Sequence, residues 1–337
     1  MYMRSSIFLL LLMLLVSSCL ENTSPTEKKQ DSRDKVVDVQ NSLKEINTGD
    51  VLISSSARLY IADGYLLISD SKGYDKLIHL FDNSDYNHVA STGTLGQGNN
   101  EIANLGSIGV DNKHKKFYVS DHGKMRIYSY DIDSLLNMPE SYEPIVKVRI
   151  NNSLFPSSYC YVNDTLSYAR IIKPTSVSTF EQSVAKWNMQ TGEINFMEYS
   201  HPDVKNKRSM FDISLEHGIY VEGYQRHDLL SICDLDGMLV CNIYGPDWNG
   251  GGKSNMSCYG DVMITSDNII ATYSGGNYNE AYNPTKLHVF DIKGNYQKTL
   301  DVKFKIVDCC YDPKQNRVIM AFDDEIQFGY LDLDNVL

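Results

Sequence analysis

The chain has 337 residues, of which 42% are hydrophobic and 22% charged, so it can bury a large core and has an ordinary globular balance. Its formal net charge of −12 argues against a nucleic-acid partner, because proteins that bind a phosphate backbone usually carry a basic stripe. Tyrosine is abundant, with 23 residues, which suits half-buried β-structure.

The first nineteen residues have the pattern of an export signal. Arg4 supplies a positive start, residues 7–16 form an apolar run, and Val16-Ser17-Ser18-Cys19 forms a small-residue cleavage site. The apolar run is too short to span a bilayer. Its ending resembles the lipobox of bacterial lipoproteins, which implies that Cys19 carries the lipid that anchors the mature protein. The alternative is an ordinary signal peptide with an incidental cysteine.

Residues 20–35 are polar and charged and show no periodicity. We therefore expect a flexible tether there, followed by a globular domain over residues 36–337. The anchored protein would lie in the cell envelope, and the sequence leaves open which leaflet and which side. Six further cysteines permit disulfides in an exported protein, but their spacing does not require them, and we favour buried free thiols.

Short apolar strands recur along the chain with a period of about 50 residues, which is the signature of a repeat architecture. The strands in one column occupy residues 66–70, 117–121, 166–170, 219–223, 269–273 and 318–322. In a second column, an apolar residue precedes the Asp or Asn at positions 82, 131, 188, 234, 291 and 332. Short hairpin turns follow these positions, because Asp, Asn and Gly favour chain reversal.

A further strand follows five of these turns, but the sixth unit has none because the chain ends at Leu337. Two strand-like pieces, residues 36–39 and 51–55, lie before the first unit. We therefore predict an all-β fold, a six-bladed β-propeller of four-stranded antiparallel blades. The ring would be closed by an N-terminal strand that completes the last blade and removes its exposed edge.

The chain resembles the TolB-like, NHL-like six-bladed propeller lipoproteins of Bacteroidetes. The residues that carry the resemblance are the lipobox, the six strand pairs and the Gly-rich segment 92–102, which is similar to the family's GxGPxEF-type segment. Asn99 stands where proline is common there, and Ile102 where phenylalanine is common. The resemblance implies a binding protein of the cell envelope.

The connections of a propeller open on two faces. The fourth-to-first and second-to-third links open on one face, here called the loop face, and the other links open on the opposite turn face. The loop face would carry both Gly-rich loops, 93–101 and 245–253, and the longer links 171–183, 223–228 and 274–285. We expect a binding site on the loop face, because loops positioned by a rigid scaffold often carry function.

Aromatic and basic residues of these loops have the composition of recognition surfaces. The candidates for ligand binding are Tyr224, Arg226, His227, Trp248, Tyr273, Tyr278 and Tyr282. A second group, Asp70, Asp121, Arg170 and again Tyr273, ends equivalent strands and is expected to ring the channel mouth, where it could bind a cation or a polar ligand. For each residue the alternative is an ordinary packing or turn role.

Linear catalytic signatures are missing: the sequence has no HExxH, no GxSxG and no paired CxxC. We therefore predict no catalytic residue, no metal and no cofactor. The leading hypothesis is a non-catalytic propeller that binds an envelope peptide, glycan or protein through its loop face. One alternative is a hydrolase or lactonase with a metal or polar site at the channel mouth, since ligands contributed by different blades escape linear motifs. Another is a scaffold in an envelope complex.

Overall fold

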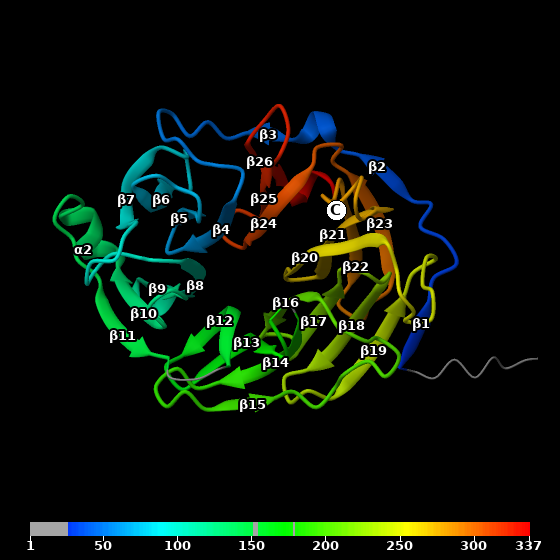
Figure 1. Ribbon diagram of the computed structural model, residues 1–337. Helices are drawn as coiled ribbons and strands as arrows, with labels where there is room; N and C mark the ends of the chain where they lie inside the picture. The colour runs from blue at the N-terminus through cyan, green and yellow to red at the C-terminus, as the bar shows by residue number, and fades with distance from the viewer. Residues whose placement is uncertain (1–25, 151–153, 178) are drawn as a thin grey trace, which may run out of the picture.

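Six antiparallel sheets surround a central axis in the computed structural model, which describes residues 26–150, 154–177 and 179–337 (Figure 1). Four strands form each sheet, in the order of the chain in the first five blades, and two sheets gain a fifth strand. The predicted six-bladed β-propeller is confirmed. The export signal, Cys19 and the start of the expected tether lie outside the described residues.

The first three blades run through the first half of the chain. Blade 1 contains β4 (Ala57–Ala62), β5 (Tyr65–Asp70), β6 (Lys76–Asp82) and β7 (His88–Thr94). Blade 2 contains β8 (Leu105–Asp111), β9 (Lys116–Asp121), β10 (Arg126–Asp131) and β11 (Ile145–Arg149), with helix α2 (Ile132–Asn137) between the last two. Blade 3 contains β12 (Phe155–Asn163), β13 (Leu166–Pro174), β14 (Phe180–Trp187) and β15 (Ile194–Phe196).

The other three blades complete the ring. Blade 4 contains β16 (Ser209–Ser214), β17 (Ile219–Tyr224), β18 (Leu229–Asp234) and β19 (Leu239–Tyr244). Blade 5 contains β20 (Met256–Ile264), β21 (Asn268–Asn277), β22 (Lys286–Asp291) and β23 (Tyr296–Asp301). Blade 6 contains β24 (Ile306–Asp312), β25 (Arg317–Phe322), β26 (Phe328–Asp332) and β3 (Lys44–Glu45).

Buried apolar side chains fill the interfaces between neighbouring blades. The cluster between blades 1 and 2, for example, joins Leu67 and Leu80 to Val119 and Phe117, and the Phe117 ring stacks on Tyr130 at 4.8 Å. Because a neighbouring blade covers each face of the middle strands, these strands are apolar almost throughout. This explains why the second strand of each unit gives the clearest repeat in the sequence.

An N-terminal strand closes the ring, as predicted, but it is neither of the two expected segments. Strand β3 pairs antiparallel with β26 and places Glu45 opposite Gly329. The candidate segment 36–39 instead contributes β2 (Val36–Asp38), which pairs in parallel with β23 of blade 5. The other candidate, 51–55, forms no strand, and its Ser54 donates hydrogen bonds to Asp70.

Before it reaches blade 6, the N-terminal segment runs along the outer edges of blades 4 and 5 (Figure 1). Strand β1 (Glu27–Lys29) pairs in parallel with β19 of blade 4. Between β1 and β2, Arg33 forms an ion pair of 2.8 Å with the buried Asp228 and donates to the Tyr259 hydroxyl at 2.9 Å. The expectation of a flexible tether up to residue 35 is therefore wrong for its last ten residues, which dock on the propeller.

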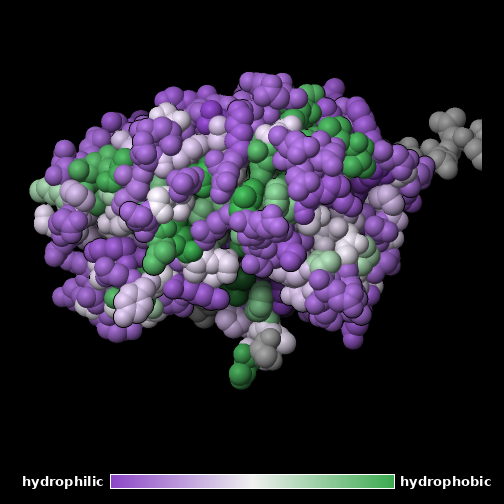
Figure 2. Space-filling view, turned by 90° about the horizontal axis from the view of Figure 1, so that it is seen from above, coloured by the Kyte–Doolittle hydropathy of each residue, from purple (hydrophilic) through white to green (hydrophobic). Residues whose placement is uncertain are grey.

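The exterior is mostly hydrophilic on the side seen in Figure 2, where hydrophobic residues gather only in small patches. Within the described ranges, none of the helices is long and apolar enough to cross a membrane. All six cysteines there carry free thiols, as expected, and four of them are buried.

Candidate functional site

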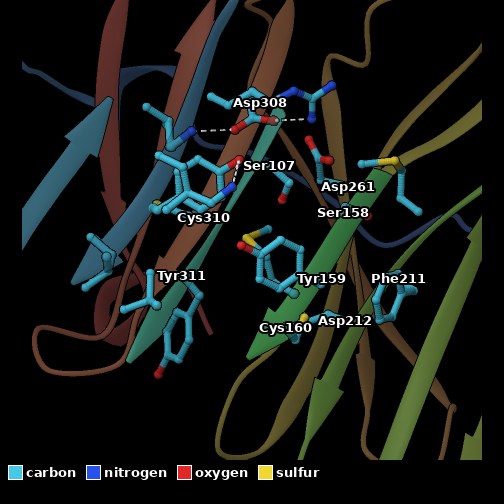
Figure 3. Close-up of a pocket in the computed structure, with 18 of the residues that line it drawn as sticks. Ser107, Ser158, Tyr159, Cys160, Phe211, Asp212, Asp261, Asp308, Cys310 and Tyr311 are labelled. Carbon is cyan, nitrogen blue, oxygen red and sulfur yellow. Dashed lines mark hydrogen bonds and ion pairs between the residues drawn. The ribbon is translucent and has the colours of Figure 1, made fainter. Parts of the chain in front are cut away.

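A central cavity of about 770 Å³ follows the propeller axis. It is lined by the innermost strand of every blade, namely β4, β8, β12, β16, β20 and β24. Its walls carry charged, hydroxyl and sulfur-bearing side chains that point inward from facing strands (Figure 3). This volume lies within the range of pockets that hold small ligands.

Two acidic residues and an arginine meet in this cavity (Figure 3). Arg58, from β4, approaches Asp308 of β24 with 3.4 Å between Nη1 and Oδ1. The other oxygen of Asp308 accepts a hydrogen bond of 2.7 Å from the Leu59 backbone. The carboxylate of Asp261 projects from β20 toward the same space. The Arg58 side chain is 54% exposed and is therefore accessible from the cavity.

Arg170 of β13, one of the predicted residues, reaches the same cavity from the opposite side. Its Nε donates to the Ser157 hydroxyl and its Nη1 to the backbone carbonyl of Ser209, both at 3.0 Å. The Ser209 hydroxyl in turn donates to Glu222, which forms a buried ion pair of 2.9 Å with Lys207. This network holds the Arg170 guanidinium in place and leaves its Nη2 without a hydrogen-bond partner among the described residues.

Irregular pairing in the inner strands directs several of these side chains. In β20, Gly260 and Asp261 together oppose Thr272, so the strand contains a β-bulge. A second register shift lies just before Asp308 in β24, and β8 and β12 carry shifts as well. Bulges turn side chains away from the regular alternation and are frequent beside functional sites. Only glycine fits at position 260 without a rearrangement, since a Cβ there would lie 2.5 Å from Thr272 Oγ1.

Burial changes the ionisation of three of the four charged groups. Burial raises the pKa of Asp261, although the positive charges of Arg58 and Arg170 partly oppose this shift. Burial also raises the pKa of Asp308, and the negative charge of Asp261 adds to that shift. Burial also lowers the pKa of Arg170 to about 10, and the nearby charge of Arg58 adds to this effect. The two acids therefore hold a proton more tightly than isolated carboxyl groups, while both guanidinium groups stay charged at neutral pH.

The mouth of the cavity on the loop face is bordered by two of the predicted loops. A smaller pocket there is lined by Gln225 and Tyr282 and shares Arg58, Asp261 and Asp308 with the main cavity. Beside it, Arg226 stacks on Tyr278 with 3.2 Å between its guanidinium carbon and the ring centre. The Tyr278 ring packs edge-on against Tyr282 at 4.9 Å. Three of the predicted residues thus form one group at the mouth, here called the rim: Arg226, Tyr278 and Tyr282.

Two predicted acids do not line the cavity. Asp70 is buried and accepts hydrogen bonds from the backbone and hydroxyl of Ser54 and from the Lys72 backbone. Asp121 is buried too and accepts four hydrogen bonds from backbone amides of the two adjoining loops. Both carboxylates are saturated by the chain itself, so the expectation that they ring the channel mouth is wrong.

Four predicted aromatic residues serve packing. Tyr224 is fully buried and contributes to a cluster on which Trp248 packs. His227 is 8% exposed and lies against Trp248, with ring centres 5.8 Å apart. Tyr273 is also buried and stacks on His288 at 4.1 Å. The prediction that Tyr224, His227 and Tyr273 lie on an exposed recognition surface is therefore wrong. Trp248 is partly exposed.

Sequence reasoning missed Arg58, Asp261 and Asp308. The strands compared there were the second and third of each unit, whereas these residues lie on first strands. A sequence signal was present, because Arg58 follows Ala57 and precedes Leu59 in an otherwise apolar strand, and a charge inside such a strand must face water or a partner. Within the described part of the chain, no group of three or more His, Cys, Asp or Glu side chains is placed to hold a metal ion.

The fold and the cavity together define a class: a six-bladed β-propeller with a polar, mixed-charge cavity on its axis. Over residues 28–225, more than half of its length, the sequence matches the DUF5128 family, described as a 6-bladed beta-propeller. The chain belongs to this family. No curated protein matches the sequence significantly.

Several solved propellers are similar in fold. A member of the DUF4221 family from Bacteroides vulgatus superposes with a TM-score of 0.55 at 12% identity, covering 86% of this chain and 94% of its own. A Bacteroides fragilis protein thought to be exported gives the same TM-score and identity, with 88% of each chain covered. The extracellular domain of a B. thetaiotaomicron protein, thought to be a one-component system, superposes with a TM-score of 0.50 at 13% sequence identity. The match covers 81% of this chain and 33% of that one. At these identities the likeness concerns the fold alone.

Proposed function

We propose that this protein is a cell-envelope lipoprotein of the TolB-like, NHL-like kind, anchored through Cys19, and that it binds an envelope glycan or peptide without catalysis. The lipobox pattern supports the anchor. An envelope location agrees with similar propellers described as exported or as an extracellular domain. The tether to the membrane would be short, because the chain docks on the propeller from residue 27 onward.

The observation that carries the binding role is the cavity mouth on the loop face. There the accessible guanidinium of Arg58, the carboxylate of Asp261 and the half-exposed ring of Tyr282 border one opening. Binding sites for small ligands are usually concave and lined by aromatic side chains with a few charged or polar groups. The Arg226–Tyr278 stack presents a rigid surface beside it, and such residues commonly dominate binding energy.

The test uses the full chain, purified in detergent, on arrays of soluble oligosaccharides and peptides. A rim variant replaces Arg226, Tyr278 and Tyr282 by alanine. The control replaces Leu215 and Met238, which are 55% and 56% exposed on the turn face, by alanine. We expect the rim variant to lose the array signals of the wild type and the control to keep them. Equal signals from both variants would show that the loop face is not the binding site.

A hydrolase acting in the cavity is the second candidate, and one observation favours it. Asp261 is a carboxyl group with a raised pKa in a cavity, which is the usual setting of a general acid. This function predicts turnover of simple lactones, esters or glycosides that is lost in Asp261→Asn. Absence of turnover by the wild type over such a panel would leave the binding role.

A further inference from the structure

Building on the proposed binding role, we propose that the ligand of the cavity is an acidic sugar. Its single carboxylate would lie between Arg58 and Arg170, and its hydroxyl groups would meet Asp261 and the serine-rich wall. The proposal concerns the chemical class of the ligand, so it can fail while the loop-face binding role stands.

The first step is that the unpaired donors of Arg58 and Arg170 favour an anionic ligand. Arg58 makes one long contact of 3.4 Å with Asp308, and neither its Nε nor its Nη2 has a hydrogen-bond partner among the described residues. Arg170 also keeps its Nη2 unpaired there, while it is crowded by the charge of Arg58. Two guanidinium groups with open donors in a partly dehydrated cavity are stabilised by an anion that bridges them.

The second step is the charge of that anion. The two arginines contribute two positive charges, and the acid pair Asp261 and Asp308 holds a proton tightly because burial disfavours its ionisation. The net charge of these four side chains is therefore closer to +1 than to zero, so a ligand with a single negative charge balances it. A carboxylate carries one negative charge and matches the planar donor pattern of a guanidinium, whereas a doubly charged phosphate would be repelled by the remaining carboxylate.

The third step is the rest of the ligand. Eight serines line the cavity, among them Ser107 and Ser158, which project from its walls in Figure 3, and Ser157, whose hydroxyl group accepts a hydrogen bond from Arg170. Hydroxyl groups donate and accept hydrogen bonds, so such a wall suits a body that carries several hydroxyl groups of its own. At the mouth, the exposed Tyr282 ring offers a flat apolar surface of the kind on which a sugar ring packs. These features favour a sugar acid over the carboxyl end of a peptide.

The test is calorimetric titration of the full chain in detergent with three probes: glucuronate, neutral glucose and the dipeptide alanyl-alanine. The variant is Arg58→Gln, since Arg58 is accessible and makes only one weak contact. The matched control is Arg208→Gln, which removes a loop-face arginine that stacks on Phe180 outside the cavity. We expect glucuronate to bind at least tenfold more tightly than glucose or the dipeptide, with a tenfold or larger loss in Arg58→Gln and less than a twofold change in Arg208→Gln.

Each other result overturns part of the account. Equal affinities for glucuronate and glucose, or unchanged glucuronate binding by Arg58→Gln, would refute the carboxylate assignment. Tighter binding of alanyl-alanine than of glucuronate, sensitive to Arg58, would refute the sugar and leave the loop-face role. If no probe binds, the sugar assignment fails. If the rim variant also keeps the array signals of the wild type, the loop-face role fails with it.

Discussion

Asp212 shows how burial changes the chemistry of a single carboxyl group. It lies on β16 in the deeper part of the cavity, where its Oδ2 accepts a hydrogen bond of 2.8 Å from the Ile264 backbone. Its Oδ1 lies 3.9 Å from the Cys160 thiol, and no cation pairs with it among the described residues. Burial raises the pKa of Asp212 to about 6, so the folded chain keeps a proton that the unfolded chain releases.

The sign of the resulting pH dependence follows directly. Below the ordinary pKa of an aspartate both states are protonated, and the contribution of Asp212 to stability is lost as the pH rises through about 6. We expect the free energy of unfolding of the wild type to fall by about 1–2 kcal/mol between pH 4.5 and pH 7, relative to that of Asp212→Asn, whose amide cannot titrate. Urea unfolding of both proteins at the two pH values measures this difference. Parallel pH profiles would contradict it.

Individual residues were also the hardest to predict from the sequence. Asp70, Asp121 and Arg170 occupy equivalent positions in the sequence repeat, yet only Arg170 lines the cavity. Asp70 and Asp121 end their strands, whereas β13 continues past Arg170 to Pro174. The difference lies in the loops, which fold back and donate backbone hydrogen bonds to the two aspartates. Asp261 was missed for a related reason, because its direction depends on a β-bulge that no local pattern announces. Tertiary hydrogen bonds and register decide these cases.

At the scale of elements, the N-terminal segment is the least expected part of the fold. Its strands β1 and β2 extend blades 4 and 5 in parallel, and Arg33 anchors it between them. The Arg33 and Asp228 side chains are 8% and 0% exposed, and the guanidinium carbon lies 5.3 Å from the Tyr273 ring centre. The ion pair is thus shielded from water and ties the segment to the loop-face side of blade 4.

Removal of the arginine tests this anchor. Arg33→Ala would leave Asp228 buried and unpaired, so we expect a loss of about 3–5 kcal/mol in the free energy of unfolding. The control Lys35→Ala removes an exposed side chain while its carbonyl still accepts a hydrogen bond from Thr299, and it should change stability little. Urea denaturation of the three proteins gives the comparison. A similar, small change in both variants would show that the ion pair does not hold the segment.

The sequence predicts most strands of the blades and misses the closing one for a physical reason. The second strands are covered on both faces, so their apolar runs recur every ~50 residues. Strand β3 is only two residues long, and both Lys44 and Glu45 are exposed, so it carries no apolar signal. The more apolar residues 36–39 have the pattern of a closing strand, but β2 pairs with blade 5, and the neighbouring Val39 is buried in the apolar cluster between blades 5 and 6.

At the scale of the whole molecule, a lipid on Cys19 would keep the propeller near the membrane, because only seven residues separate Cys19 from strand β1. Strand β1 pairs with the outer strand of blade 4, so a chain that continues from a lipid on Cys19 would reach the propeller at that blade.

Replacement of Cys19 tests the anchor. Cys19→Ser removes the thiol that would carry the lipid, so we expect the protein to move from the membrane fraction to the soluble fraction. The matched control is Cys160→Ser, which alters a thiol inside the cavity wall and should leave the distribution unchanged. Fractionation of the bacterial envelope followed by immunoblotting measures the distribution. Membrane retention of Cys19→Ser in high salt would contradict lipid anchoring at this residue.

The most direct test of the binding site is hydrogen–deuterium exchange of the full chain in detergent, with and without saturating glucuronate. We predict slower exchange in the rim loops, residues 225–228 and 278–285, and in the first strand of blade 1, which carries Arg58. The turn-face hairpins at residues 234–238 and 291–295 should exchange unchanged. Protection confined to those hairpins would contradict the account that the loop-face mouth of the channel binds the ligand, and no protection anywhere would contradict the assignment of an acidic sugar.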